Sequence, residues 1–271
     1  MSPELTIRPM RNDDLTTFQQ IDAKIFDVND QLSEEFFLQR VQMPGFFALE
    51  TKTGGQIGYL ILGQFSDEIG HLGRIGVKKS MQSQGIGSYL MEFALNWFLQ
   101  QEKIQEVQLY TQVDNLHAQG LYKKFGFQVI GQTLHYFVPF DSLTAKGSFS
   151  LQLAQPEEFS RIADLFPKAL PIGAIRRYHK KEQPIYILRD VSDNIVGAAR
   201  FTPSFPGCFP FELNTILGFD DFVFGFQPLC VPPSEFLRIT YHENEQLAQL
   251  CETRHYKLHH RLFRMQRILQ K

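Results

Sequence analysis

The chain has 271 residues and a formal net charge of −2. This length exceeds the usual ~100–200 residues of one domain and allows two modest domains, while the near-neutral charge offers no general field for holding a nucleic acid. The first residues lack a basic stretch followed by an apolar one, and no run approaches the ~18 apolar residues that cross a bilayer. We therefore expect a cytoplasmic protein with neither a nucleic-acid nor a membrane partner.

The cysteine pattern argues against a disulfide framework. Cys208, Cys230 and Cys251 are odd in number and far apart in the sequence, and no CxxC pair is present to hold a metal. We expect reduced, buried thiols and no metal site.

The first elements alternate between strand and helix. Leu5 and Ile7 alternate with polar residues and predict a strand, after which Asn12 is expected to cap a helix. Apolar residues recur on one face of that helix, at Leu15, Phe18, Ile21 and Ile25. A second amphipathic stretch, 33–41, precedes two strands at 46–50 and 57–64, with turn residues at 52–55 between them.

The middle of the first half reads as strand, glycine loop, helix. The strand covers 70–77, the loop 82–87, and apolar residues then follow at helical spacing from Ile86 to Trp97. A further strand at 107–113 leads to a short helix at 115–125 that ends at Gly126, and residues 129–140 are strand-like.

The second half appears as a diverged copy of the first. Residues 141–148 are the best candidate for a linker, and the chain then restarts with a strand at 151–153 and a helix at 156–165. A hairpin follows at 185–188 and 195–201. Strand, helix and strand at 237–240, 244–253 and 258–265 repeat the ending of the first half.

One segment has the composition of an anion site. Gln82-Ser83-Gln84-Gly85-Ile86-Gly87-Ser88 follows a strand and opens a helix, whose first backbone N–H groups are unpaired and favour a phosphate. Two nucleotide-binding patterns fail here. A Rossmann loop needs a small residue where Leu90 stands, and a P-loop needs Lys and Ser or Thr where Ser88 and Tyr89 stand.

The segment resembles motif A of the GNAT superfamily of acetyltransferases, which reads Gln or Arg, two residues, Gly, one residue, Gly or Ala. Gln82, Gly85 and Gly87 match it. The family also has an Asn, an Ala, a Tyr and a Gly-Phe pair further on, and the residues in that register are Asn115, Ala118, Tyr122, Gly126 and Phe127. The resemblance covers residues 5–140.

The resemblance implies an α/β fold of two GNAT-like domains, each a mixed, splayed β-sheet flanked by helices, and acetyl-CoA as co-substrate. Tyr122 matches the general acid, and the base would be His71 or Glu68. The N–H of Val77 would hold the oxyanion during direct transfer. The residues implied in cofactor binding are Ile75, Gly76, Val77, Gln82, Ser83, Gln84, Gly85, Ile86, Gly87, Ser88, Asn115 and Tyr122.

Ordinary structural roles stand beside these. The two glycines can form a simple tight turn, Tyr122 can be a packing residue, and Asn115 is a favoured helix cap. His71 can be a strand histidine with a satisfied hydrogen bond, and Glu68 a solvated carboxylate. The basic tail from Arg254 onward fits a solvated strand face better than a nucleic-acid patch.

The second half lacks the chemistry of the first. Asn244 aligns with Asn115, but Cys251 takes the place of Tyr122, and residues 201–237 contain no glycine loop of the required type. We therefore expect a catalytic GNAT domain at 1–140 and a degenerate GNAT-like domain at 149–271.

The expected activity is acetylation of a primary amine on a small molecule. The alternatives are a peptide N-terminus or lysine as acceptor, or a sensor or scaffold that binds acyl-CoA without turnover. The sequence leaves open whether the protein is a monomer or a homodimer.

Overall fold

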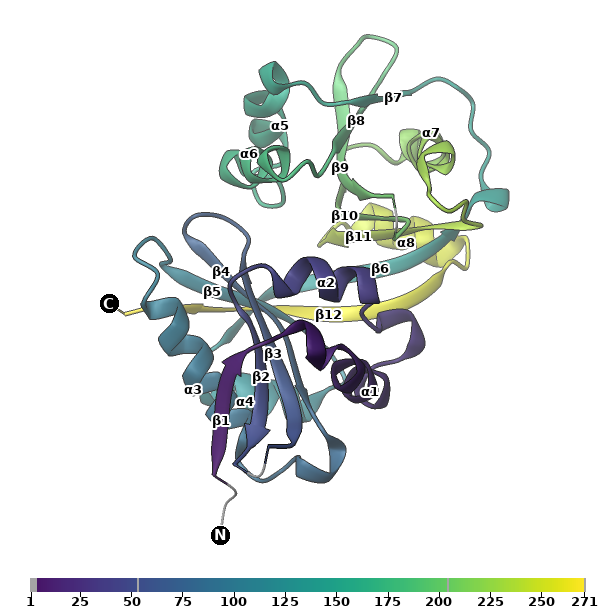
Figure 1. Cartoon of the computed structure of the whole chain (residues 1–271). Coiled ribbons are helices and arrows are strands. Elements are labelled where there is room, and N and C mark those ends of the chain that lie inside the picture. The colour runs from purple at the N-terminus through teal and green to yellow at the C-terminus, as the bar shows by residue number, and fades with distance from the viewer. Residues whose placement is uncertain (1–3, 53, 204, 271) are drawn as a thin grey trace. The chain divides into compact units, whose positions relative to one another are not determined.

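The computed structural model describes residues 4–52, 54–203 and 205–270. It contains two compact units: unit 1 comprises the residues up to 111, 115–129 and those from 265 on, and unit 2 comprises 112–114 and 130–264. The same order of elements occurs twice along the chain: a strand, two helices, three strands, a helix, a strand, a helix and a long strand (Figure 1). Thr53 of the predicted turn lies outside the described residues.

Unit 1 is a mixed sheet with helices on both faces. Its strands are β1 (Leu5–Pro9), β2 (Phe46–Thr51), β3 (Gln56–Gln64), β4 (Ile69–Val77) and β5 (Glu106–Gln112). Its helices are α1 (Leu15–Ile25), α2 (Glu34–Val41), α3 (Ile86–Leu99) and α4 (Leu116–Lys124). β1 to β4 pair antiparallel in chain order, and β5 joins β4 in parallel.

The two faces of this sheet are packed by different helices. Phe18 of α1 and Phe37 of α2 are fully buried in one cluster with Tyr59 of β3. Gly70 of β4 faces α3 so closely that a Cβ atom there would lie 2.7 Å from the Phe98 ring. The cores of the two faces therefore fix β3 and β4 between the helices.

The start of the first helix corrects one prediction. Asn12 does not cap α1; it opens a short 3-10 turn, Asn12–Asp14, that precedes the helix. The carboxylate of Asp14 accepts the backbone N–H of Arg11 at 2.8 Å and is held at 2.7 Å by Arg8, which also bonds Glu50. Helix α1 therefore begins at Leu15, after a turn in which Asp14 pairs with Arg8 and accepts the backbone N–H of Arg11.

A buried carboxylate ties α1 to the sheet. Asp22 is 1% exposed and accepts hydrogen bonds from Arg74 of β4 at 2.9 Å, from the Tyr59 hydroxyl and from the backbone N–H of Leu32 at 2.8 Å. Arg74 also donates to the carbonyl of Asp30 at 2.8 Å. Because a buried charge is tolerated only when it is fully paired, this network fixes the segment between α1 and α2 against β4.

Unit 2 repeats the plan of unit 1. Its strands are β7 (Ser150–Leu153), β8 (Ile185–Arg189), β9 (Ile195–Thr202), β10 (Gly207–Leu213) and β11 (Phe236–His242). Its helices are α5 (Phe159–Leu165), α6 (Ile172–Lys180), α7 (Phe219–Gly225) and α8 (Glu245–Thr253). Two long strands, β6 (Gln128–Pro139) and β12 (Lys257–Ile268), each have residues in both units. Within unit 2 the strand order is β12-β6-β11-β10-β9-β8-β7.

Sequence patterns missed three elements of unit 2: α6, β10 and α7. Strand β10 contains Pro210, which has no backbone N–H to donate to a ladder, and its register with β9 shifts between Cys208 and Phe211. The predicted strand and helix at 151–165 are present, although residues 156–158 form a 3-10 turn ahead of α5.

The predicted linker, 141–148, is hydrogen-bonded within unit 2. The Asp221 carboxylate accepts the backbone N–H groups of the four residues from Lys146 to Phe149, at 2.7 to 3.1 Å. The domain limits read from the sequence stay a prediction.

Two further expectations concern thiols and membranes. Cys208, Cys230 and Cys251 are all buried and free, as predicted. Among the helices that the structure describes, none has the length and apolar character that crossing a membrane requires.

We predict that Asp22→Ala lowers the free energy of unfolding by about 3 kcal/mol or more, because Arg74 then stays buried without its carboxylate. Urea unfolding measures the loss. Asp27→Ala is the matched control, since Asp27 is exposed and makes no capping hydrogen bond with its side chain. An equal effect of the two substitutions would contradict the role given to Asp22.

Candidate active site

The parallel strands β4 and β5 separate soon after they meet. Their register covers only Ile69–Glu106, Gly70–Val107 and His71–Gln108. From Leu72 to Val77, β4 remains paired with β3, but these described residues have no partner on β5. The backbone groups on that side of β4 are therefore available to an extended ligand, which would occupy the position of a strand.

The predicted glycine loop lies at the end of this open stretch. Gly85 is the N-cap of α3 with a φ of 81°, and no protein atom lies within 4 Å of the position of a Cβ atom on it. Gln82 donates from its side-chain amide to the carbonyl of Val77 at 2.9 Å, which fixes the loop to the strand. The first N–H groups of α3, a helix of 14 residues, follow directly after Gly85.

Helix α4 packs beside the start of α3. A Cβ atom on Gly87 would lie 3.1 Å from Leu121, so a larger residue would push the two helices apart. The ammonium group of Lys124 donates to the Ser88 hydroxyl at 3.4 Å and places a positive charge next to the predicted phosphate site. Sequence reading missed Lys124; its position one helical turn beyond Gly120 gave no signal of this contact.

The ends of α4 are formed as the sequence predicts. The side chain of Asn115 accepts the backbone N–H of Ala118 at 3.0 Å, and Gly126 has a φ of 78° at the C-terminal end. The N–H of Phe127 donates to the carbonyl of Tyr122 at 3.1 Å. The capping role of Asn115 is confirmed; its part in cofactor binding stays a prediction.

Tyr122 is a buried phenol on α4. It is 9% exposed, and its ring lies 6.1 Å from that of Phe127. Burial raises the pKa of Tyr122 to about 12, so the hydroxyl keeps its proton at neutral pH. Such a group can donate a proton to a departing thiolate.

His71 is a half-buried ring among aromatic neighbours. It stacks on Phe65 at 4.0 Å, with the edge of Tyr110 at 6.3 Å. Burial, with a smaller contribution from the nearby Arg40 guanidinium, lowers the pKa of His71 to about 4. The ring is neutral at pH 7 and able to accept a proton, although its basicity is weak.

Distance along the strand separates the base candidates from Val77. His71 precedes Val77 by six residues, which corresponds to about 20 Å at the ~3.3 Å rise of a strand. His71 could therefore act only through water if Val77 binds the reacting carbonyl. Glu68 is exposed in the turn before β4, where its side chain accepts from Gln105 at 3.3 Å, and it lies farther still.

Arg40 is a second group that sequence reading missed. Its guanidinium donates to the carbonyl of Pro44 at 2.8 Å and to that of Leu62, next to β4. Burial lowers the pKa of Arg40. The positive charge of Arg40 therefore helps to keep His71 in its neutral form.

Comparison with known proteins assigns the class. Residues 9–127 match the family model described as "Acetyltransferase (GNAT) family". Over 138 residues, 51% of this chain and 89% of the relative, the sequence is 26% identical to a Bacillus subtilis (strain 168) protein provisionally named ribosomal protein bS18-alanine N-acetyltransferase.

Solved structures extend the likeness to the whole chain. A GCN5-related N-acetyltransferase from Sphaerobacter thermophilus has a TM-score of 0.75 at 11% identity, covering 98% of this chain and 96% of that one. A tandem GNAT protein from the clavulanic acid biosynthesis pathway has a TM-score of 0.68 at 11% identity, covering 99% of both chains. The match to the GNAT family thus covers residues 9–127. Over the whole chain the fold is like that of the tandem GNAT structure, which confirms the predicted fold class.

We predict that the imidazole of His71 titrates with a midpoint near 4 rather than 6.5. The unfolded chain takes up this proton as the pH falls through 6.5 while the folded chain does not, so His71 makes the fold less stable toward acid. NMR of ¹³C-labelled histidine measures the midpoint, and His71→Gln identifies the resonance. A midpoint above 6 would contradict the environment described for this ring.

Proposed function

We propose that unit 1 transfers the acetyl group of acetyl-CoA directly to a primary amine. The observation that carries this proposal is the separation of β4 from β5 after His71, with the glycine loop at the end of the open stretch. Few other ligands need both an extended backbone edge and a phosphate-binding helix start.

The two parts of the site suit the two parts of the co-substrate. The amide groups of the pantetheine arm can pair with the backbone of β4 at Ile75, Gly76 and Val77. The diphosphate fits the loop residues 82–88, where the helix dipole and Lys124 supply positive charge. Gly85 allows a close approach because it has no side chain.

The proposed reaction needs no covalent intermediate on the enzyme. The amine nitrogen bonds to the thioester carbon, the backbone N–H of Val77 stabilises the oxyanion, and the carbon–sulfur bond then breaks. Tyr122 gives its proton to the CoA thiolate, and the amine loses its proton to water, with His71 as a candidate acceptor at the end of a water chain. Glu68 is the weaker candidate because it is exposed.

We propose a small-molecule amine as the acceptor. A peptide N-terminus is the second candidate, because the Bacillus subtilis relative carries the name of a ribosomal protein alanine N-acetyltransferase.

We further propose that unit 2 binds no acetyl-CoA. At the place of the glycine loop, α7 carries Asp220 and Asp221 in its first turn. Asp220 pairs with Arg254, and Asp221 accepts the backbone N–H groups of residues 146–149, so contacts within unit 2 occupy this helix start. The side chain of Asn244 donates to the carbonyl of Leu213 at 3.0 Å and ties α8 to the end of β10. Cys251 replaces the proposed acid, and burial raises the pKa of this thiol to about 12.

We predict that Gly85→Val weakens binding of acetyl-CoA at least about tenfold, a loss of about 1.4 kcal/mol. Calorimetry on the intact protein measures the affinity and should find a single site per chain. Gly54→Val is the matched control, because Gly54 also has a positive φ and, among the described residues beyond its chain neighbours, no atom within 4 Å of its Cβ position, but lies in the turn between β2 and β3. Equal affinities for the two variants would refute the loop assignment.

We predict that Tyr122→Phe lowers kcat at least about tenfold and leaves the affinity for acetyl-CoA unchanged, because only proton transfer to the thiolate is lost. Thiol release with a panel of small amines and short peptides measures kcat. Tyr89→Phe is the control, since the Tyr89 hydroxyl is exposed and only bonds the carbonyl of Leu5 at 3.4 Å. Tight binding without thiol release from any acceptor would favour a sensor instead.

A further inference from the structure

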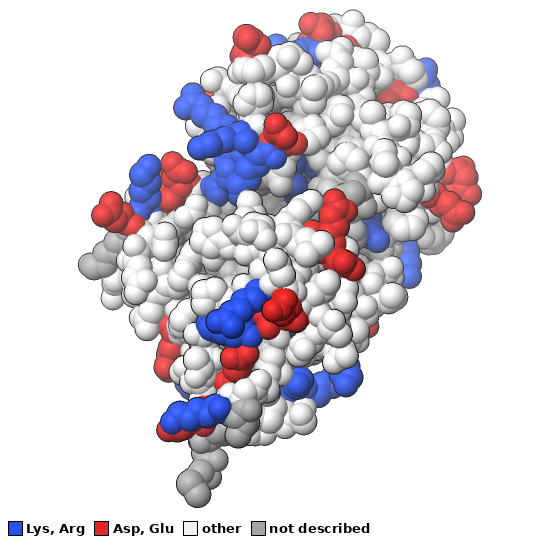
Figure 2. Space-filling view, in the orientation of Figure 1, with Lys and Arg blue, Asp and Glu red and all other residues white. Residues whose placement is uncertain are grey.

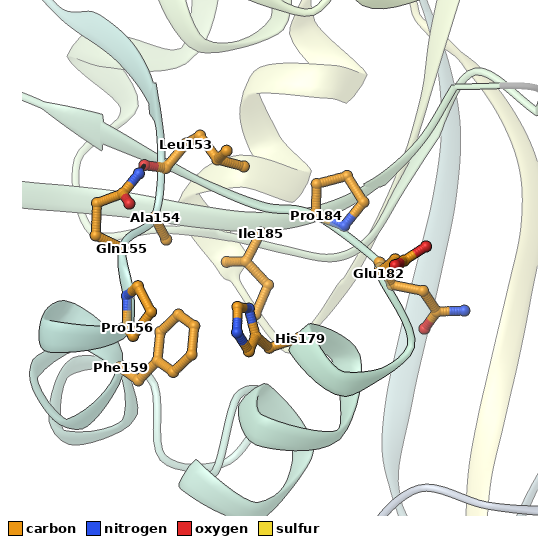
Figure 3. A pocket seen from close by; sticks show the side chains of 10 residues that line it. Leu153, Ala154, Gln155, Pro156, Phe159, His179, Glu182, Pro184 and Ile185 are labelled. Carbon is orange, nitrogen blue, oxygen red and sulfur yellow. Dashed lines mark hydrogen bonds between the residues drawn. The ribbon is translucent and has the colours of Figure 1, made fainter.

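A pocket lies in unit 2 (Figure 3), and none of its lining residues belongs to the proposed acetyl-CoA site. Its volume is about 260 Å³, and it is formed where β7 ends, α5 begins, α6 ends and β8 begins. Ten residues line it: Leu153, Ala154, Gln155, Pro156, Phe159, His179, Glu182, Gln183, Pro184 and Ile185.

The walls of the pocket are mostly rings and aliphatic groups. The rings of Phe159 and His179 meet edge to face with 5.2 Å between their centroids, and the rings of Pro156 and Pro184 flank them. Ile185 is buried and lies between His179 and Ala154 in Figure 3. The only charged carboxylate in the lining, Glu182, is exposed and points away from the two aromatic rings.

Unit 1 shows why this space exists in unit 2. The backbone N–H of Met10 donates to the carbonyl of Phe46 at 2.9 Å, and that of Ala154 donates to the carbonyl of Ile185 at 2.9 Å. In both units the next residue donates its N–H to a carboxylate three positions on, Asp14 or Glu158, at 2.8 Å. Ala154 therefore occupies the structural position of Met10.

The substitution removes a side chain that fills the same space in unit 1. Met10 is 5% exposed and packs in a cluster with Phe18 and Phe46. In unit 2 a methyl group replaces its thioether chain, and Ile185 replaces Phe46. Protein interiors normally close such gaps, because missing packing contacts lower the free energy of unfolding. An open pocket at this point therefore either binds a ligand or leaves the fold less stable.

We propose that this pocket binds a small, uncharged, planar aromatic molecule. Apolar walls hold water poorly, and an edge-to-face pair of rings presents faces on which another ring can stack. Two proline rings add rigid apolar surface to the lining. The inference does not depend on the acceptor, nor on the activity proposed for unit 1.

The experiment compares two probes of equal carbon number, flat 2-naphthol and puckered decahydro-2-naphthol, on the full chain labelled at its Ile and Leu methyl groups. We expect 2-naphthol to shift the methyl resonances of Ile185 and Leu153 and to bind at least about tenfold more tightly than the saturated probe. Equal affinities would overturn the preference for a planar ring, and no shift with either probe would overturn the site.

Ala154→Met restores to unit 2 the side chain that unit 1 has. We expect it to weaken 2-naphthol binding at least about tenfold without lowering the melting temperature, because the new side chain fills the pocket. Ala145→Met, on an exposed residue outside the lining, is the control and should bind normally. His179→Ala removes one exposed wall and should weaken 2-naphthol more than decahydro-2-naphthol. Unchanged binding in both pocket variants would refute the proposal.

Discussion

Strand β4 bonds to β5 over only three residues, and the chemistry of unit 1 depends on where that pairing stops. A fully paired sheet would use its own backbone groups and leave none for a ligand. Separation of the two strands exposes the edge of β4 from Leu72 to Val77 and directs it toward the start of α3. Unpaired backbone N–H and C=O groups on such an edge cost free energy unless a ligand or water pairs with them. The fold therefore favours an extended polar partner at this edge. The proposed co-substrate, a thioester with two amide groups in its arm, would pair with this edge.

The rest of unit 1 holds the open edge in place. Gln82 binds the carbonyl of Val77 and keeps the loop against the strand that it follows. On the other face, Arg74 is clamped by Asp22, which itself bonds Tyr59 and the segment after α1. A strand that pairs with β5 over only three residues is thus supported by side-chain hydrogen bonds and by its ladder with β3, which runs from Gly70 to Val77 with one register shift.

The sequence predicted the turns and helix caps of this site, which depend on neighbouring residues. Gly85 and Gly126 adopt positive φ angles, and Asn115 caps α4. These features could be predicted because turns and helix caps depend on a few adjacent residues. The fold class followed from two such motifs in the right order. The contacts of Arg40 with Leu62 and of Lys124 with Ser88 escaped because these partners are 22 and 36 residues apart in the sequence. The strand β10 escaped because Pro210 is a poor strand residue, tolerated where a ladder is already irregular.

Unit 2 has the backbone features of unit 1 but not the side chains proposed for its site. Its parallel strands β10 and β11 pair over only two residues, Asn244 caps the next helix, and His255 adopts a φ of 56° where unit 1 has Gly126. The N–H of Tyr256 bonds the carbonyl of Cys251 as that of Phe127 bonds Tyr122, so the backbone is conserved between the units even where the side chains are not. If unit 2 binds no CoA, as we propose, strand separation alone does not make such a site. The units differ between the open strand and the next helix. In unit 1 residues 78–85 join β4 to α3 and include Gln82 and Gly85 of the glycine loop, whereas in unit 2 the shorter stretch 214–218 joins β10 to α7, which carries two aspartates in its first turn.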